Sequence, residues 1–152
     1  MFRYLFSALL LTVCLHFISS SAYSEHGAVG QSSSGNKGEF PFLTAEMVKQ
    51  EMAGPKKLIL IDVGSIQEYQ GAHIPGAINI PSVAIKAQPN RLPKDKSARI
   101  IIYNGRGEGG RARAHQAATR VWGMGYTHVS VFLGGMADWI DRKYPIKKGL
   151  KP

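Results

Sequence analysis

The sequence predicts one α/β domain in which a parallel sheet carries helices on both faces. The chain has 152 residues and is 44% hydrophobic, a size and composition that suit a single domain with its own core. Short apolar runs recur without the alternation of a surface strand, which is typical of strands covered on both faces. Helical stretches alternate with these runs, as they do in a parallel sheet.

The expected strands are the apolar runs and the expected helices are the segments between them. The strands are predicted at residues 58–63, 77–80, 100–103 and 129–133. The helices are predicted at residues 44–52, 65–70, 83–87, 111–122 and 136–143. Ser65 and Glu68 have the spacing of a capping box at the start of the second helix, and Thr44 can cap the first.

The first 39 residues are predicted to lie outside the folded domain. Residues 1–24 have the charged start, apolar run and small residues of a signal peptide, with cleavage expected after about Ser24. The apolar run is shorter than a membrane-spanning helix, so no stable membrane insertion is expected after cleavage. Residues 25–39 are rich in Gly and Ser and are interpreted as a flexible leader. The protein is therefore expected to be periplasmic or secreted.

Cys14 is the single cysteine of the chain, and it lies inside the predicted signal peptide. The mature protein is then expected to contain no thiol nucleophile, disulfide or thiolate metal site. The formal net charge is +9, but the basic residues lack the interleaved aromatic residues of a nucleic-acid surface, so no nucleic-acid partner is expected. No His or Cys spacing indicates a metal site, and no cofactor is predicted.

A glycine-rich segment after the strand at 100–103 is the candidate site, because ligands of doubly wound folds bind beyond the carboxyl ends of the strands. Glycines can turn their amides inward, and the following helix adds its own free N–H groups, so the segment is predicted to cradle an anion. The residues expected to line it are Asn104, Gly105, Arg106, Gly107, Glu108, Gly109, Gly110 and Arg111. Asp62, His73 and Arg113 are expected to support it. The segment also fits G-x-G-x-x-G, but the next strand ends without the acidic residue that a dinucleotide site requires.

Several sequence runs have a recognisable pattern: Leu60-Ile61-Asp62-Val63, Glu68-Tyr69, His73-Ile74-Pro75-Gly76-Ala77-Ile78-Asn79-Ile80-Pro81, and Gly134-Gly135-Met136-Ala137-Asp138-Trp139 followed by Tyr144-Pro145-Ile146. Together they resemble the rhodanese (sulfurtransferase) domain over about residues 40–148. The resemblance implies a three-layer α/β/α fold with about five parallel strands, the fifth at residues 40–43. It leaves residues 149–152 as the end of a basic tail.

The resemblance also implies a catalytic cysteine directly after the strand that here ends at Tyr103. Asn104 stands at that position, and a carboxamide is no nucleophile, so no catalytic residue is predicted and sulfurtransferase activity is not expected. Two further departures fall nearby. Gly64 stands where the family commonly has an arginine. Six residues, Gly105 to Gly110, separate Asn104 from Arg111, whereas the family usually has four between the cysteine and the arginine that opens the helix.

The expected function is therefore binding, of a small oxyanion or of an exported protein partner. One alternative is a degenerate loop in which Glu108 pairs with Arg106 or Arg111 and fills the cradle. Another is a sulfurtransferase-type enzyme that works with a cysteine or thiol supplied in trans.

Overall fold

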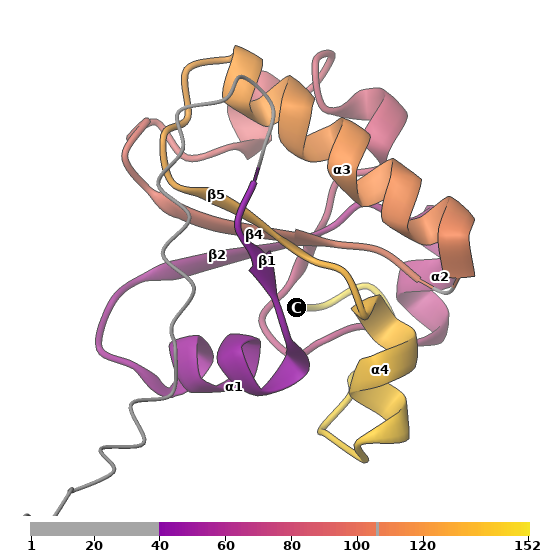
Figure 1. The fold of residues 1–152 in the computed structure, drawn as a ribbon. Helices are drawn as coiled ribbons and strands as arrows, with labels where there is room; N and C mark the ends of the chain where they lie inside the picture. Colours follow the sequence, from indigo (N-terminus) through magenta and orange to yellow (C-terminus); the bar gives the residue numbers. More distant parts are fainter. Residues whose placement is uncertain (1–39, 106) are drawn as a thin grey trace, which may run out of the picture. The chain divides into compact units, whose positions relative to one another are not determined.

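The structure, a computed structural model, describes residues 40–105 and 107–152. Its strands are β1 (Phe42–Leu43), β2 (Leu58–Asp62), β3 (Ile78–Asn79), β4 (Arg99–Tyr103) and β5 (Val129–Phe132). Its helices are α1 (Ala45–Ala53), α2 (Ile66–Gly71), α3 (Gly107–Gly123) and α4 (Gly135–Asp141), with 3₁₀ turns η1 (Ser82–Ala84) and η2 (Pro89–Arg91). The predicted strand–helix alternation is confirmed (Figure 1).

The five strands form one parallel sheet in the order β1-β5-β4-β2-β3. The two longest strands, β2 and β4, lie side by side in the middle, with Asp62 paired to Tyr103 in register. Residues that follow these strands are consequently brought together at one edge of the sheet. This edge is where the sequence places its candidate site.

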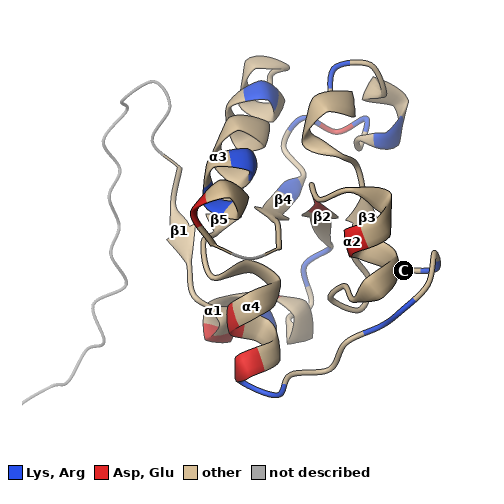
Figure 2. Ribbon diagram, turned by 90° about the vertical axis from the view of Figure 1, so that its right-hand side faces the viewer, with Lys and Arg blue, Asp and Glu red and all other residues tan. Residues whose placement is uncertain are grey.

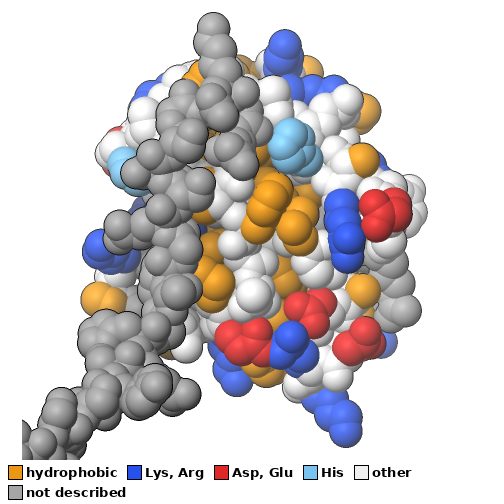
Figure 3. Space-filling view, in the orientation of Figure 1, with side chains coloured by type: hydrophobic (Ala, Val, Ile, Leu, Met, Phe, Trp, Pro, Cys, Tyr) orange, Lys and Arg blue, Asp and Glu red, His pale blue; other side chains and the backbone are white. Residues whose placement is uncertain are grey.

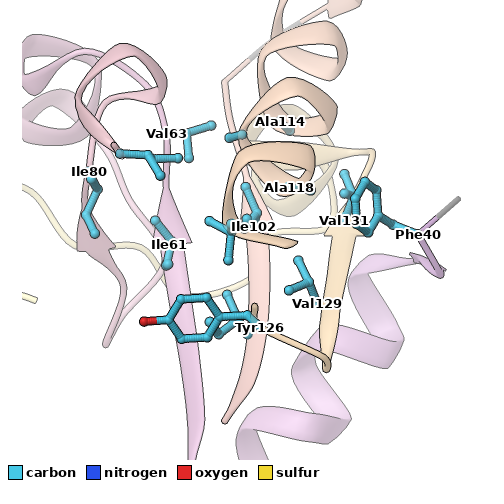
Figure 4. Packing of buried hydrophobic residues seen from close by; sticks show 14 of the residues in the cluster. Phe40, Ile61, Val63, Ile80, Ile102, Ala114, Ala118, Tyr126, Val129 and Val131 are labelled. Carbon is cyan, nitrogen blue, oxygen red and sulfur yellow. The ribbon is translucent and has the colours of Figure 1, made fainter. Parts of the chain in front are cut away.

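Two apolar cores separate the three layers. On one face, α3 presents Ala114, Ala117, Ala118 and Val121 to the sheet (Figure 4). These small side chains recur at helical spacing, so the helix packs close to the strands. On the other face, α1, α2 and α4 contribute a second buried cluster that includes Val48, Tyr69 and Trp139. The three-layer α/β/α architecture is confirmed.

Local boundaries follow the predicted caps. The Ser65 hydroxyl accepts from the Glu68 amide, and the Glu68 carboxylate accepts from the Ser65 amide at 2.7 Å, which completes the expected capping box. Thr44 caps α1 through the Met47 amide. The helix expected at 83–87 is instead the short 3₁₀ turn η1.

The predicted start of the long helix is wrong. A glycine-rich loop is expected up to Gly110, with the helix beginning near Arg111, but α3 begins at Gly107. The buried face of the helix outweighs the low helix propensity of its glycines. Gly107, Gly109 and Gly110 therefore belong to the first turn of α3 rather than to a loop.

The chain after α4 docks against α2. His73 and Lys147 form an antiparallel bridge, with both backbone hydrogen bonds at 2.9 Å, and the Gly149 amide donates to the Gln70 carbonyl. The buried His73 ring stacks on Tyr69 with its Nδ1 2.9 Å from the Tyr69 carbonyl and its Nε2 3.0 Å from the Lys151 carbonyl. This histidine consequently holds the C-terminal segment to the domain.

Charged side chains lie mainly at the surface, and several pair between elements. Arg142 pairs with Glu46 of α1 and with Asp138 of α4, which joins the two helices of one layer. Acidic and basic side chains gather at that edge of the molecule in Figure 3. Lys and Arg positions recur along α3, which also has Glu108 in its first turn, and Asp and Glu positions occur on α1, α2 and α4 (Figure 2).

The predicted signal peptide, Cys14 and the leader lie outside the described residues. Within residues 40–105 and 107–152, no helix has the length and apolarity that a membrane crossing requires.

Candidate functional site

The candidate site is centred on Asn104, the first residue after β4. Its side chain is buried, with the residue 2% exposed. Oδ1 accepts from the Gly105 amide at 2.5 Å. Because that amide can only donate, the oxygen must face it, and the Nδ2 group must lie on the other side. Nδ2 is buried and has no hydrogen-bond partner within the part of the chain that the structure describes.

The backbone around Asn104 is fixed by its contact with the start of α4. The Met136 amide donates to the Asn104 carbonyl at 2.9 Å. Gly135 has φ +54°, and a Cβ built there would lie 2.1 Å from the Asn104 carbonyl oxygen and 2.7 Å from that of Gly105. Only glycine permits this approach, so residue 135 sets the position of residue 104.

Three side-chain oxygens converge where a side chain at residue 64 would begin. A Cβ at Gly64 would lie 3.0 Å from Asn104 Oδ1, 3.0 Å from Asp62 Oδ1 and 3.1 Å from Glu68 Oε2. The arginine expected from the resemblance would start in this crowded position. The absence of a side chain at Gly64 thus leaves the space into which the Asn104 carboxamide oxygen points.

The turn between β2 and α2 is rigidly held below these oxygens. The Gly64 amide donates to Asp62 Oδ1 at 2.8 Å. Asn79, from the neighbouring strand β3, donates through Nδ2 to the backbone carbonyls of Asp62 and Gly64. Asp62, Gly64 and Asn79 are all buried. Their hydrogen bonds orient the Asp62 carboxyl group.

Asp62 is a buried acid, and its environment changes its protonation. Burial raises the pKa of its carboxyl group from 3.8 to about 6, although hydrogen bonds from the Gly64 amide and the Tyr103 hydroxyl act in the opposite direction. The sequence places Asp62 among the supporting residues. In the structure it lies beside Asn104, at the ends of the two paired central strands.

Glu68 and Arg113 link the two helices that flank the site. Arg113 Nη1 lies 3.4 Å from Glu68 Oε2, and its Nε donates to the Gly109 carbonyl at 3.4 Å. The Ser65 amide is the main cause that lowers the pKa of Glu68, with further contributions from the Ser65 hydroxyl and Arg113. Arg113 thus lies between α2 and the first turn of α3.

The glycine-rich residues form the first turn of α3 rather than a loop. Gly107 begins the helix at φ +70°, and a Cβ at Gly110 would lie 3.4 Å from the Gly105 backbone. The first N–H groups of a helix have no partner within it, so this turn keeps the anion-attracting character that the sequence predicts. Arg106 lies outside the described residues.

The outer part of the predicted cradle is exposed. Arg111 pairs with Glu108 at 3.2 Å, and their side chains are 55% and 91% exposed. This is one of the two pairs expected for a degenerate loop, but an ion pair so open to solvent is easily separated. His73, predicted as a supporting residue, contacts the backbone carbonyls of Tyr69 and Lys151 through its two ring nitrogens.

The sequence does not identify every residue that shapes this site. From the sequence, Glu68 is a capping residue and part of a motif run, and the structure adds that it pairs with Arg113 and borders Gly64. Gly135 falls in the motif run from Gly134 to Trp139, and only the structure shows the close approach that it allows. Asn79 falls in the motif run from His73 to Pro81, and only the three-dimensional structure shows its contact with the β2–α2 turn.

A separate cavity of about 540 Å³ lies at the other end of the central strands, where β2 and β4 begin. Its lining includes Glu51 and Arg99, which form an ion pair at 2.6 Å, and Arg99 also donates to Ser130. Glu51 and Arg99 thus compensate each other's charge. Within the described residues, no group of three or more His, Cys, Asp or Glu side chains could hold a metal ion.

Comparisons with known proteins agree with the fold. Residues 44–142 match the family model described as Rhodanese-like domain. The YrkF protein of Bacillus subtilis (strain 168) is 33% identical over 113 residues, which cover 74% of this chain and 58% of YrkF. Thiosulfate sulfurtransferase PspE of Escherichia coli (strain K12) is 36% identical over 78 residues, which cover 51% of this chain and 70% of PspE.

A solved structure described as a rhodanese with anions from E. coli is also similar. It is 32% identical with a TM-score of 0.51, and the match covers 61% of this chain and 100% of that one. The chain spans little more than half of YrkF's length.

We predict that Gly135→Ala destabilises the domain by roughly 2–5 kcal/mol, because the new Cβ would collide with the Asn104 carbonyl and residue 135 would keep a positive φ. Urea unfolding measures the change. Gly71→Ala is the matched control, because a Cβ there meets nothing within 4 Å. Equal unfolding free energies for the two variants would contradict the close approach.

We predict that Asp62 makes the domain less stable as the pH rises from about 4 to about 6. The folded-state pKa of about 6 lies above the starting value of 3.8, so the folded state binds more protons in this window. The contribution of Asp62 to the free energy of unfolding should fall by about 2 kcal/mol across this window and by about 3 kcal/mol over the full titration, since one pKa unit corresponds to about 1.4 kcal/mol.

The measurement is urea unfolding of the wild type and of Asp62→Asn at several pH values. Asn keeps an acceptor for the Gly64 amide but does not titrate, so the difference between the two curves isolates Asp62 from other acids such as Glu68. Parallel curves would show that Asp62 has no raised pKa.

Proposed function

This chain belongs to the rhodanese-like domain family, and we propose that it acts as an exported binding protein that holds a small oxyanion without transforming it. The observation that carries the proposal is the buried carboxamide of Asn104, whose Nδ2 donor has no acceptor among the described residues. A donor in such a place favours a ligand that only accepts hydrogen bonds.

The neighbourhood of Asn104 supports an anionic ligand. The first turn of α3 offers backbone N–H groups and the positive end of the helix dipole. Arg113 lies beside that turn and can present a planar guanidinium group to a tetrahedral anion. Arg111 lies on the same helix and is more exposed than Arg113, and its partner Glu108 is readily displaced.

Two carboxyl groups near Asn104, those of Glu68 and Asp62, would repel an anion, but the negative charge of each is reduced by its surroundings. Glu68 accepts from the Ser65 amide and faces Arg113, which together compensate its charge. The pKa of Asp62 is raised to about 6 by burial, so this carboxyl group gains a proton under mildly acidic conditions. Anion binding at this site should therefore strengthen as the pH falls toward 6.

The absence of transfer chemistry is the second part of the proposal. The reactive sulfur of a sulfurtransferase must be carried by a nucleophile, and the Asn104 carboxamide cannot form a persulfide. Cys14 is the only cysteine in the sequence, and we propose that it is removed with residues 1–24 on export. The relative PspE is a thiosulfate sulfurtransferase, which makes sulfur oxyanions the first ligands to test.

We predict that the melting temperature of the chain from residue 25 rises in sulfate, sulfite, thiosulfate or phosphate. A ligand at 100 times its dissociation constant adds about 2.7 kcal/mol to the free energy of unfolding. For a domain of this size, each kcal/mol corresponds to roughly 3–6 °C. Chloride at matched ionic strength is the control for general salt effects.

Two arginine variants make the melting experiment specific. Arg113→Gln should abolish most of the anion-induced rise, whereas Arg91→Gln, which removes the same charge from η2, should keep it. A flat response to every anion, or equal rises in chloride, would remove the binding proposal while leaving the fold unaffected.

We also predict that the chain from residue 25 does not convert thiosulfate and cyanide to thiocyanate by itself. Turnover that begins only when a thiol or a thiol-bearing protein is added would favour the alternative, a sulfurtransferase-type enzyme with its thiol supplied in trans. Turnover by the protein alone, including its Cys14→Ser form expressed in full, would contradict the proposed loss of activity.

A further inference from the structure

We propose that Asn104 is a site of self-catalysed modification, in which the Gly105 backbone nitrogen closes on the Asn104 side chain and releases ammonia. The inference concerns the covalent fate of this residue and does not require that an anion binds. Its consequence for binding, given below, rests on the proposed function.

The local sequence supplies the reacting groups. The chain contains asparagines at 36, 79, 90 and 104, and only Asn104 is followed by glycine. A glycine has no side chain to obstruct its own nitrogen, so this nitrogen reaches the preceding carboxamide more easily than that of any other residue. Asn79 precedes Ile80 and Asn90 precedes Arg91, so both provide comparisons within the same domain.

The structure holds these groups together. The Gly105 nitrogen lies 2.5 Å from Asn104 Oδ1, which is bonded directly to the carbon that would be attacked. The Asn104 carbonyl is fixed by the Met136 amide, and the contact of Gly110 with the Gly105 backbone limits movement on the other side. The two reacting atoms are thus confined near one another rather than brought together by chance.

The surroundings act on the charge and on the leaving group in different ways. Attack places negative charge on Oδ1, which faces the same point beside Gly64 as Asp62 Oδ1 and Glu68 Oε2, so these carboxyl groups oppose the charge and Arg113, paired with Glu68, partly compensates it. The leaving group is the buried Nδ2, which lacks an acceptor among the described residues and therefore has no hydrogen bond there to lose. Gly105 is partly exposed, so water can reach the product.

The chemistry balances without an oxidant or reductant. The Gly105 N–H proton passes to solvent, and the Gly105 nitrogen forms a bond to Asn104 Cγ. The Cγ–Nδ2 bond then breaks, and Nδ2 takes up a proton and departs as ammonia. Water then opens the five-membered imide at either carbonyl. The products are aspartate at residue 104 or an isoaspartyl linkage between residues 104 and 105.

The modification would change the site in a defined way. A carboxylate at residue 104 would join Asp62 and Glu68 around Gly64, where three oxygens already converge. If the proposed function is correct, the modified protein rejects the oxyanion that the fresh protein binds. The ratio of the two forms would then record the age of the molecule.

The test follows the conversion in purified full-length protein, incubated at neutral and mildly alkaline pH. Peptide mapping by mass spectrometry locates aspartate and isoaspartate, and released ammonia is measured in parallel. Conversion is expected at Asn104 with Asn79 and Asn90 unchanged, and it should accelerate with pH because the Gly105 nitrogen must lose its proton.

Two comparisons decide whether the structure promotes the reaction. Folded protein should convert at least several-fold faster than the same chain unfolded in urea. Gly105→Ala should slow conversion by an order of magnitude or more, and its Cβ fits, since the nearest atom, Glu68 Oε1, is 3.6 Å away. Slower or equal conversion in the folded protein, or no effect of Gly105→Ala, would overturn the proposal.

The link to binding is tested separately with Asn104→Asp in the sulfate and thiosulfate melting experiment. Loss of the anion response in this variant supports the consequence stated above, and an unchanged response contradicts it. Because ammonia release and peptide mapping need no ligand, a failure of the proposed function leaves the modification test interpretable.

Discussion

The hydrogen bond between the Met136 amide and the Asn104 carbonyl positions the site in this structure. It ties the end of the central strand β4 to the start of α4, and Gly135 makes it possible by leaving the space that a Cβ would fill. Residue 104 is thereby fixed by its backbone, so its side chain has little freedom to turn away. The carboxamide is held inward even though it leaves one buried donor without an acceptor in the described part of the chain.

A second constraint comes from the neighbouring strand. Asp62 and Tyr103 are paired in register, so the chains that leave β2 and β4 start side by side. Asn79 then fixes the first of these turns, and Arg113 joins the helices that follow. The site is rigid because these strands, turns and helices each hold their neighbours, an arrangement suited to binding by preformed donors.

Much of the fold can be predicted from the sequence, because parallel strands buried on both faces leave continuous apolar runs and the helices between them have recognisable caps. The start of α3 cannot be predicted in this way, because Gly107, Gly109 and Gly110 are poor helix formers and packing of the later turns decides their conformation. At the site, the apolar run at residues 100–103 places Asn104 correctly just after a strand. The contacts of Glu68 and His73 depend on segments far away in the chain, so local patterns indicate only their local roles.

The shortness of the outer strands has its own consequence. β1 and β3, which border the sheet, each contain two residues, and both have helices or turns immediately beside them. A border this short offers few free backbone groups to a strand from another molecule. The outer strands pair only with Ile61 and Asp62 of β2 and with Val131 and Phe132 of β5, so a strand from another molecule that added to either of them would form a ladder of two residues.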